Sequence, residues 1–540
     1  MEWNGLVAAE GILIHGRRRS ARLYYRPLLC VLAIILSYDA AQAQLFERAL
    51  VFQGARLVTM SGDPIEEGSL IVKGGRIKQI GSKVDVPFLS KTFDLAGKTV
   101  TPGFIDSWSA LGRLAGSSSA DPTALARDAF DAYAKDAFQD ALRNGLTTVY
   151  VGTGGSAGIT GVGMVMRLVP RDDGAIGEVV SNDAALCINL DSGASVVSRL
   201  KTYRSVRKQF KDAMKYRQLL EDYEEELKEY LEKLEERREE KSDSEDKEDA
   251  KEGDSEEDVD EDDESTPDDE PPPPPPPHPD PPEDAVDKST TSVIHRMSQD
   301  ESSLDADGDD QEDDQDKENG DKEDGEKKDD EDEEELEKPT EPTPDRKSNV
   351  LLRAIDHELP VRISAHRSAD IINALALAEE FNLDIILEGA TEARFVANQL
   401  SDAGVPVVLG QAVRSGRHVD NEFRRHVHDT GDALSEAGVR WTVSSGGQSP
   451  QAARFVGINA QLAAAHNRQT SDWLRLVTTD AAEILGLSHG SGRLVRGGQA
   501  DFVIWSGDPS DPASRVEQVY VAGKLAYEAK NADAAAGGGR

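Results

Sequence analysis

The stretch Thr101-Pro102-Gly103-Phe104-Ile105-Asp106-Ser107-Trp108-Ser109 decides the fold, because it opens a long alternation of strands and helices. Its apolar part follows a Pro-Gly turn and predicts a strand at Gly103–Trp108. A helix is expected from about Pro122 to Arg143, and a second strand from Leu146 to Val151. Strands that alternate with helices indicate βα units around a parallel sheet.

The alternation continues through most of the chain. Further strands are expected at 179–190, 361–365, 384–387, 405–409 and 440–444, with helices at 369–381, 392–403 and 451–465. About eight such units favour an α/β fold of the (β/α)8 TIM-like barrel type over an open doubly wound sheet. No GxGxxG follows an early strand, and Gly152-Thr153-Gly154-Gly155 lacks the spacing of a phosphate-binding loop.

The two ends of the chain have a different sequence pattern from the middle. Short apolar runs alternate with Gly-rich turns between Leu50 and Val100, and again between Ala500 and Lys524, which is typical of short antiparallel strands. We therefore expect a small composite β-sandwich from residues 44–101 and 488–530, which flanks a barrel from residues 102–241 and 348–487.

The N-terminus predicts an export signal over residues 1–43. Five arginines precede the apolar run 28–36, and Ala41-Gln42-Ala43 offers a cleavage site. The run is shorter than the roughly 20 residues that span a bilayer, and no other segment is predicted to cross one. We expect an exported protein, periplasmic or extracellular; an uncleaved membrane anchor and a misassigned start codon are the alternatives. Removal of the signal leaves Cys187 alone, so no internal disulfide can form.

The net charge of −41 belongs mainly to one segment. Residues 242–347 contain 47 acidic and 11 basic side chains, which leaves 55 acidic and 50 basic residues elsewhere. No basic stripe is present and the acidic segment would repel phosphate groups, so nucleic acid is excluded as a partner.

The acidic segment 242–347 follows a charged helix that is expected from Ser205 to Lys241, either a barrel helix with an apolar stripe or a short coiled coil. The segment is nearly free of aromatic residues and contains the run Pro271–Pro277, so it is predicted to be a disordered acidic and Pro-rich insertion. Such a chain is expected to bind divalent cations weakly, or basic protein partners. Self-association and pairing with an active paralogue stay open.

Four parts of the chain have motifs of a known family: Pro102–Asp106, Leu359–Ile371, Leu387–Glu392 and, most family-specific, Thr479–Leu487 with Gly492–Trp505. They resemble the amidohydrolase superfamily, specifically its exported imidazolonepropionase-like branch. The resemblance implies a barrel with a composite β-sandwich. It also implies one or two divalent metals, such as zinc, and hydrolysis of non-peptide carbon–nitrogen bonds, including cyclic amides.

The metal ligands that the resemblance implies are missing from this chain. The His-x-His positions fall on Ser107 and Ser109, and the histidines of two later strands fall on Ser364 and Gly389. The final-strand aspartate falls on Gly446. A serine hydroxyl is a poor replacement for imidazole or carboxylate as a metal ligand, so we expect no bound metal or other cofactor.

Weak catalytic candidates remain near these positions. His366 and Asp370 are one helical turn apart, and Asp106 and Glu388 are the carboxylates nearest to the missing ligands. His426-Val427-His428 is a further His-x-His, but it lies in a polar, Arg-rich stretch.

Three hypotheses for function follow. The first is an inactive pseudoenzyme that serves as an exported binding or scaffold protein. The second is a hydrolase of carbon–nitrogen bonds with non-standard ligands. The third makes the acidic insertion the functional part, as a tether for cations or basic partners.

Overall fold

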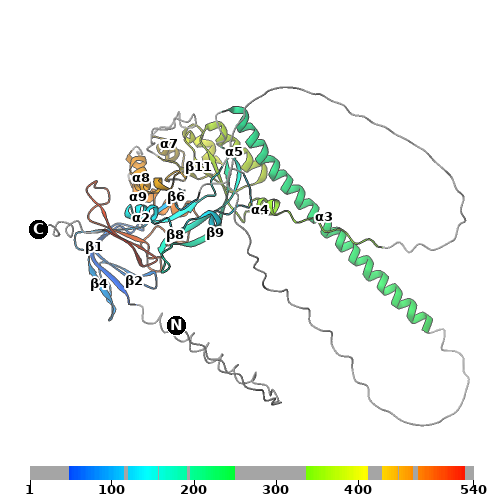
Figure 1. Ribbon diagram of the computed structural model, residues 1–540, viewed down its shortest axis with the longest axis horizontal. Coiled ribbons are helices and arrows are strands. Elements are labelled where there is room, and N and C mark those ends of the chain that lie inside the picture. Colours follow the sequence, from blue (N-terminus) through cyan, green and yellow to red (C-terminus); the bar gives the residue numbers. More distant parts are fainter. Residues whose placement is uncertain are drawn as a thin grey trace, which may run out of the picture. The chain divides into compact units, whose positions relative to one another are not determined.

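The computed structural model describes residues 48–114, 120–155, 157–190, 195–249, 336–411, 429–447, 449–465 and 472–529 (Figure 1). The chain divides into two compact units, Met1–Glu224 with Glu341–Arg540 and, separately, Glu225–Thr340. The predicted signal peptide, most of the acidic insertion and His426-Val427-His428 lie outside the described residues. Within the described ranges, no helix is long and apolar enough to cross a bilayer.

Strands from both ends of the chain form one eight-stranded sheet, which confirms the composite β-domain. The strands are β1 (Leu50–Leu57), β2 (Ile65–Lys73), β3 (Arg76–Gly81), β4 (Lys91–Asp94), β5 (Thr99–Pro102), β14 (Phe502–Trp505), β15 (Val516–Val521) and β16 (Lys524–Glu528). The two ends meet where β5 pairs with β14 in antiparallel fashion, Thr99 opposite Trp505. The rings of Phe502 and Tyr520 stack in the core of this domain, and Phe52 packs edge to face against both.

The second eight-stranded sheet has the order β13-β12-β11-β10-β9-β8-β7-β6 and forms the TIM-like barrel. Its strands are β6 (Phe104–Ser109), β7 (Leu146–Val151), β8 (Gly158–Pro170), β9 (Ile176–Asn189), β10 (Val361–Ala365), β11 (Ile385–Gly389), β12 (Val407–Leu409) and β13 (Trp441–Val443). The predicted barrel is confirmed, and β7 and β10 have the bounds expected from the sequence.

Strand β8 is the exception to the parallel order, because it runs antiparallel to both β7 and β9. The sequence analysis did not predict this strand. The six residues between β7 and β8 are too few for the helical crossover that a parallel connection needs, so the chain reverses directly. The turn after β8 is closed by a hydrogen bond from Arg171 N to Ala175 O (3.0 Å).

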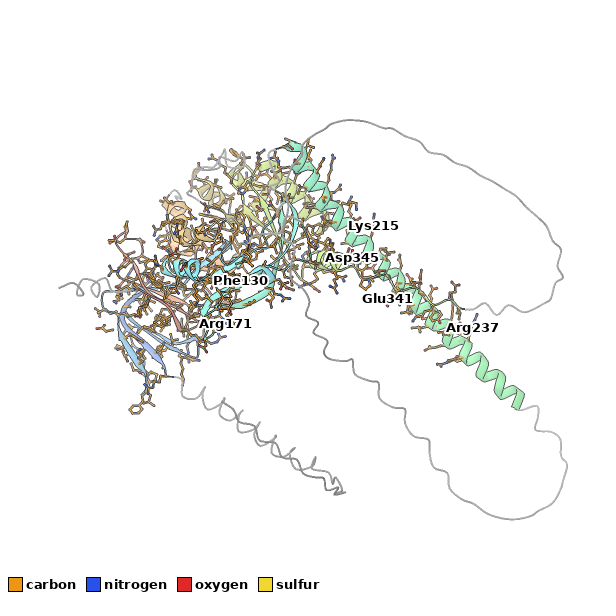
Figure 2. All side chains as sticks on the ribbon, viewed as in Figure 1. Phe130, Arg171, Lys215, Arg237, Glu341 and Asp345 are labelled. Carbon is orange, nitrogen blue, oxygen red and sulfur yellow. The ribbon has the colours of Figure 1, made fainter. Side chains whose placement is uncertain are left out.

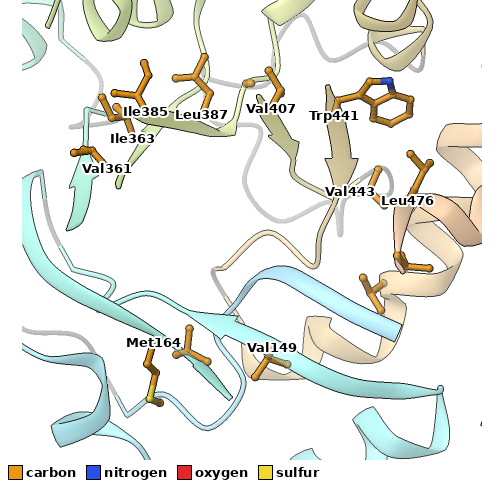
Figure 3. Packing of buried hydrophobic residues seen from close by; sticks show 14 of the residues in the cluster. Val149, Met164, Val361, Ile363, Ile385, Leu387, Val407, Trp441, Val443 and Leu476 are labelled. Carbon is orange, nitrogen blue, oxygen red and sulfur yellow. The ribbon is translucent and has the colours of Figure 1, made fainter. Parts of the chain in front are cut away.

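Helices and short 3-10 turns cover the outside of the barrel. They are η1 (Ala126–Ala129), α2 (Lys135–Arg143), α5 (Ser368–Phe381), η2 (Ala393–Val396), α6 (Ala397–Asp402), α7 (Thr430–Glu436), η4 (Pro450–Phe455), α8 (Val456–Ala465), α9 (Trp473–Leu476) and α10 (Thr479–Ile484). Buried Ile363, Leu387 and Val407 belong to the same apolar cluster as Ile371 and Ala374 of α5. Figure 3 shows Ile385 and Leu387 across the ring of strands from Val149 and Met164.

The predicted helix from Pro122 to Arg143 is wrong over its first half. Only Lys135–Arg143 is α-helical. Leu125 and Phe130 make isolated β-bridges with Val162 and Arg113 instead, because this part of the chain lies along neighbouring extended segments. Tertiary contacts here outweigh local helix propensity.

The charged helix is longer than expected. Helix α3 spans Val196–Asp249, so its last eight residues belong to the segment 242–347 that was predicted to lack structure. Figure 2 shows Lys215 and Arg237 along this helix. Five of the residues 242–249 are Ser or Asp, which have low helix propensity, so local propensity does not account for the continuation of the helix past Lys241. At the other boundary α4 (Arg346–Ile355) includes the last two residues of that segment, with the Asp345 carboxylate accepting from Lys347 N at 2.9 Å.

Candidate functional site

The carboxyl ends of β6, β10, β11 and β13 meet at one end of the barrel, where barrel enzymes carry their active sites. Val361 and Ile363 of β10 pack outward in the apolar cluster. Because strand side chains alternate between faces, Arg362 between them points into the barrel. This places an arginine among strands whose ends would carry the missing metal ligands.

Arg362 is the largest fully buried side chain of the described residues, with 1% of its surface exposed. Its Nε atom donates to Glu388 Oε1 at 2.5 Å, and its Nη2 atom donates to the carbonyl oxygen of Ser107 at 2.6 Å. The guanidinium carbon lies 4.0 Å from the centroid of the Tyr150 ring. One buried cation therefore links β10 to β11, β6 and β7.

A second pair of polar groups lies against this ion pair. The Tyr150 hydroxyl and the Cys187 thiol are 3.1 Å apart. Burial raises the pKa of Tyr150 well above its usual value, and burial likewise raises the pKa of the Cys187 thiol. Both groups are therefore held neutral, so Cys187 is not an activated nucleophile.

The seam between β6 and β13 contains Asp106, which is fully buried. Its Oδ1 atom accepts from Ser445 N at 2.9 Å and from Trp108 N at 3.4 Å. Its Oδ2 atom has no hydrogen-bond partner within the described part of the chain. Burial raises the pKa of Asp106 to about 6, against the lowering effect of hydrogen bonds from Ser445.

The serines at the missing His-x-His positions form hydrogen bonds with backbone atoms. Ser107 Oγ donates to Val443 O at 3.3 Å, and Ser109 Oγ accepts from Leu111 N at 3.3 Å. Ser364 lies opposite Glu388 in the pairing of β10 with β11. The hydroxyl groups of Ser107 and Ser109 therefore form hydrogen bonds with backbone atoms at this end of the barrel.

His366 and Asp370 contact different partners in the described part of the chain. His366 Nδ1 is 2.7 Å from Thr391 Oγ1, whereas Asp370 Oδ2 is 3.7 Å from Arg199 Nε in α3. A Cβ atom at Gly389 would collide with the His366 ring, and Gly389 has a φ of +82°. The His366 ring therefore fills the space next to Gly389.

Trp108 and Arg113 extend the site beyond the strand ends, and the sequence analysis singled out neither. A Cβ atom at Gly447 would collide with the Trp108 indole, and Arg113 Nη2 donates to Gly447 O at 2.8 Å. Burial lowers the pKa of Arg113, while nearby Cys187 and Glu388 act in the opposite direction. Gly446, at the position of the missing aspartate, has a φ of +88°, which disfavours a side chain there.

The described residues of this site do not form a ligand set for a divalent metal. Within the described ranges, no three His, Cys, Asp or Glu side chains come together in a way that could hold a metal ion. Glu388 is paired with Arg362, and His366 is bonded to Thr391. The donor set therefore differs from that of the metal sites which the resemblance implied.

Comparisons with known proteins agree with the fold. A family model described as amidohydrolase family matches residues 462–527. An amidohydrolase from Thermotoga maritima MSB8 is 20% identical, with a TM-score of 0.60, over 89% of this chain and all of that chain. A prolidase complexed with N-methylphosphonate-L-proline is 14% identical over the same shares, with a TM-score of 0.46. No curated protein matches the chain.

Residues 462–527 are therefore similar to the amidohydrolase family, and the chain shares the barrel fold of the Thermotoga maritima amidohydrolase.

Proposed function

We propose that this protein is a non-catalytic amidohydrolase-fold protein, exported to the periplasm or cell exterior, which acts as a binding or scaffold protein. The observation that carries the proposal is the buried Arg362–Glu388 ion pair at the end of the barrel where family members hydrolyse their substrates. Hydrolysis of a carbon–nitrogen bond requires an activated water and a proton acceptor. Serine and glycine at the five ligand positions supply neither.

The proposal is tested on mature protein, residues 44–540. After dialysis we expect well under one zinc, iron or manganese ion per chain by elemental analysis. We also expect no hydrolysis of cyclic amides or N-acyl amino acids, with or without added zinc or manganese. A stoichiometric metal that survives dialysis, or metal-dependent turnover, would overturn the proposal.

Asp106 supports one competing function, residual hydrolysis of carbon–nitrogen bonds. A carboxyl group with a pKa of about 6, whose Oδ2 atom has no hydrogen-bond partner among the described residues, has the properties of a general base near neutral pH. This function predicts slow turnover that rises with pH through about 6 and is lost in Asp106→Asn. Turnover of the Asp106→Asn variant equal to that of the parent excludes Asp106 from this role.

The acidic insertion supports a further binding role, for divalent cations or basic protein partners. Its density of carboxylates predicts weak, calcium-displaceable association with a basic protein such as a histone. Titration calorimetry with calcium, with and without residues 250–335, tests this role. Equal calcium binding by the two forms contradicts it.

A further inference from the structure

We propose that Arg362 is the resident cation of this barrel: its guanidinium takes over the structural role of the divalent metal and excludes metal from the site. This inference deepens the proposed non-catalytic function and rests on it. The guanidinium joins the carbonyl of Ser107 to the carboxylate of Glu388, which precedes Gly389. It therefore lies between two of the positions where the resemblance implied metal ligands.

The surroundings of the guanidinium are those of a built cation site. A carboxylate, a backbone carbonyl and an aromatic face are the three protein groups that stabilise a guanidinium most directly. Glu388, Ser107 and Tyr150 supply one of each. Both charged side chains are almost completely buried, with 1% exposure for Arg362 and 8% for Glu388.

A divalent metal cannot share this site with Arg362. Arginine stays protonated in proteins, so its charge cannot be removed to admit a second cation. Two cations a few ångströms apart in a buried site repel each other strongly. Glu388, the nearest carboxylate, is already committed to Arg362. Restoring histidines to the strand ends is therefore insufficient for metal binding while Arg362 remains.

Chemical rescue tests the cation site directly. Arg362→Ala removes the guanidinium from the buried Glu388 carboxylate, so the thermal transition of residues 44–540 should fall by several degrees or more. Millimolar guanidinium sulfate should recover at least half of that loss, because the free ion fits the same three contacts. Urea, a neutral molecule of similar shape, should recover none.

Two matched variants control for other effects of guanidinium. Arg362→Ala with Glu388→Gln lacks the carboxylate and should show no rescue. Arg207→Ala removes an exposed arginine that pairs with Glu380, and it should also show none. Rescue of either control to the same extent as Arg362→Ala, or no rescue of Arg362→Ala, would overturn the proposal.

Metal titration gives a second test that does not depend on rescue. We compare Ser107→His with Ser364→His in the parent chain and in a chain that also has Arg362→Met, which preserves side-chain volume. Zinc should bind at least tenfold tighter when Arg362 is absent, as measured by calorimetry. Equal zinc affinity in the two backgrounds would overturn the proposal. Metal-dependent turnover of the unmodified protein would refute the proposed function instead, so the two failures are distinguishable.

Discussion

Replacing Asp106 with asparagine should change the pH dependence of folding stability. Asp106 is fully buried, and its Oδ2 atom has no hydrogen-bond partner among the described residues. Asparagine has nearly the same shape, and its amide oxygen can accept the hydrogen bond that Ser445 N donates to Oδ1. The substitution therefore removes the titration of this side chain while it keeps the packing.

The sign follows from the raised pKa. The pKa of Asp106 is about 6 in the folded protein, against an ordinary value of 3.8. Between these two values the folded state holds a proton that the unfolded state has lost, so stability falls as pH rises. A difference of roughly 2 pKa units at 1.36 kcal/mol per unit corresponds to about 3 kcal/mol. This loss is complete above pH of about 6 and absent below about 3.8.

Urea unfolding of residues 44–540 at pH 4.5 and pH 7.5 measures this effect. The stability of Asp106→Asn relative to the parent should be higher at pH 7.5 than at pH 4.5, by about 2 kcal/mol, because part of the loss has already occurred at pH 4.5. Asp345→Asn is the control, because the pKa of exposed Asp345 is lowered and its contribution is lost only below its ordinary range. Its relative stability should be equal at the two pH values. A relative stability of Asp106→Asn that is unchanged between the two pH values would refute a raised pKa for Asp106.

Three further predictions follow from the site and the fold. Gly389→His should lower the free energy of unfolding in urea by more than Gly404→Ala does. Both glycines have a positive φ, but only a Cβ atom at residue 389 collides with a side chain, that of His366. Equal losses in the two variants would contradict the crowding at Gly389. We expect about 1 to 2 kcal/mol for the control, the usual cost of a left-handed conformation. Calorimetry should show similar thermal transitions, within a few degrees, when a 12-residue Gly/Ser linker replaces Glu225–Thr340, since the barrel and β-domain belong to the other compact unit; loss of the transition would show that this segment contributes to the folded unit. Iodoacetamide should modify Cys187 more slowly in the native protein than in urea at pH 8, because Cys187 is partly buried and its thiol pKa is raised; equal labelling rates in the two conditions would contradict the raised pKa.

The sequence predicted the barrel strands well, because continuous apolar runs bounded by turn residues indicate buried strands. Leu146–Val151 and Val361–Ala365 have the bounds expected for them. Strand β8 escaped prediction because its Gly-rich N-terminal part has weak strand propensity and depends on pairing with β7 and β9. The sequence showed where the family's metal ligands are missing, because those positions could be compared with the family motif. It did not show that the Arg362–Glu388 ion pair lies there instead. Arg362, a lone charge between Val361 and Ile363, was the available signal, since a charge inside an apolar strand needs a buried partner.

The pairing of β5 with β14 has a consequence for the order in which the chain can fold. Thr99 and Trp505 are partners in the sheet although about 400 residues separate them. Contacts of such separation form late, since the intervening chain must first be closed into a loop. The sheet that contains the N-terminal strands is therefore complete only after the last strands have left the ribosome. Because the sheet is completed late, the chain remains unfolded for longer. An unfolded chain can pass through a membrane channel, which is compatible with the proposed export.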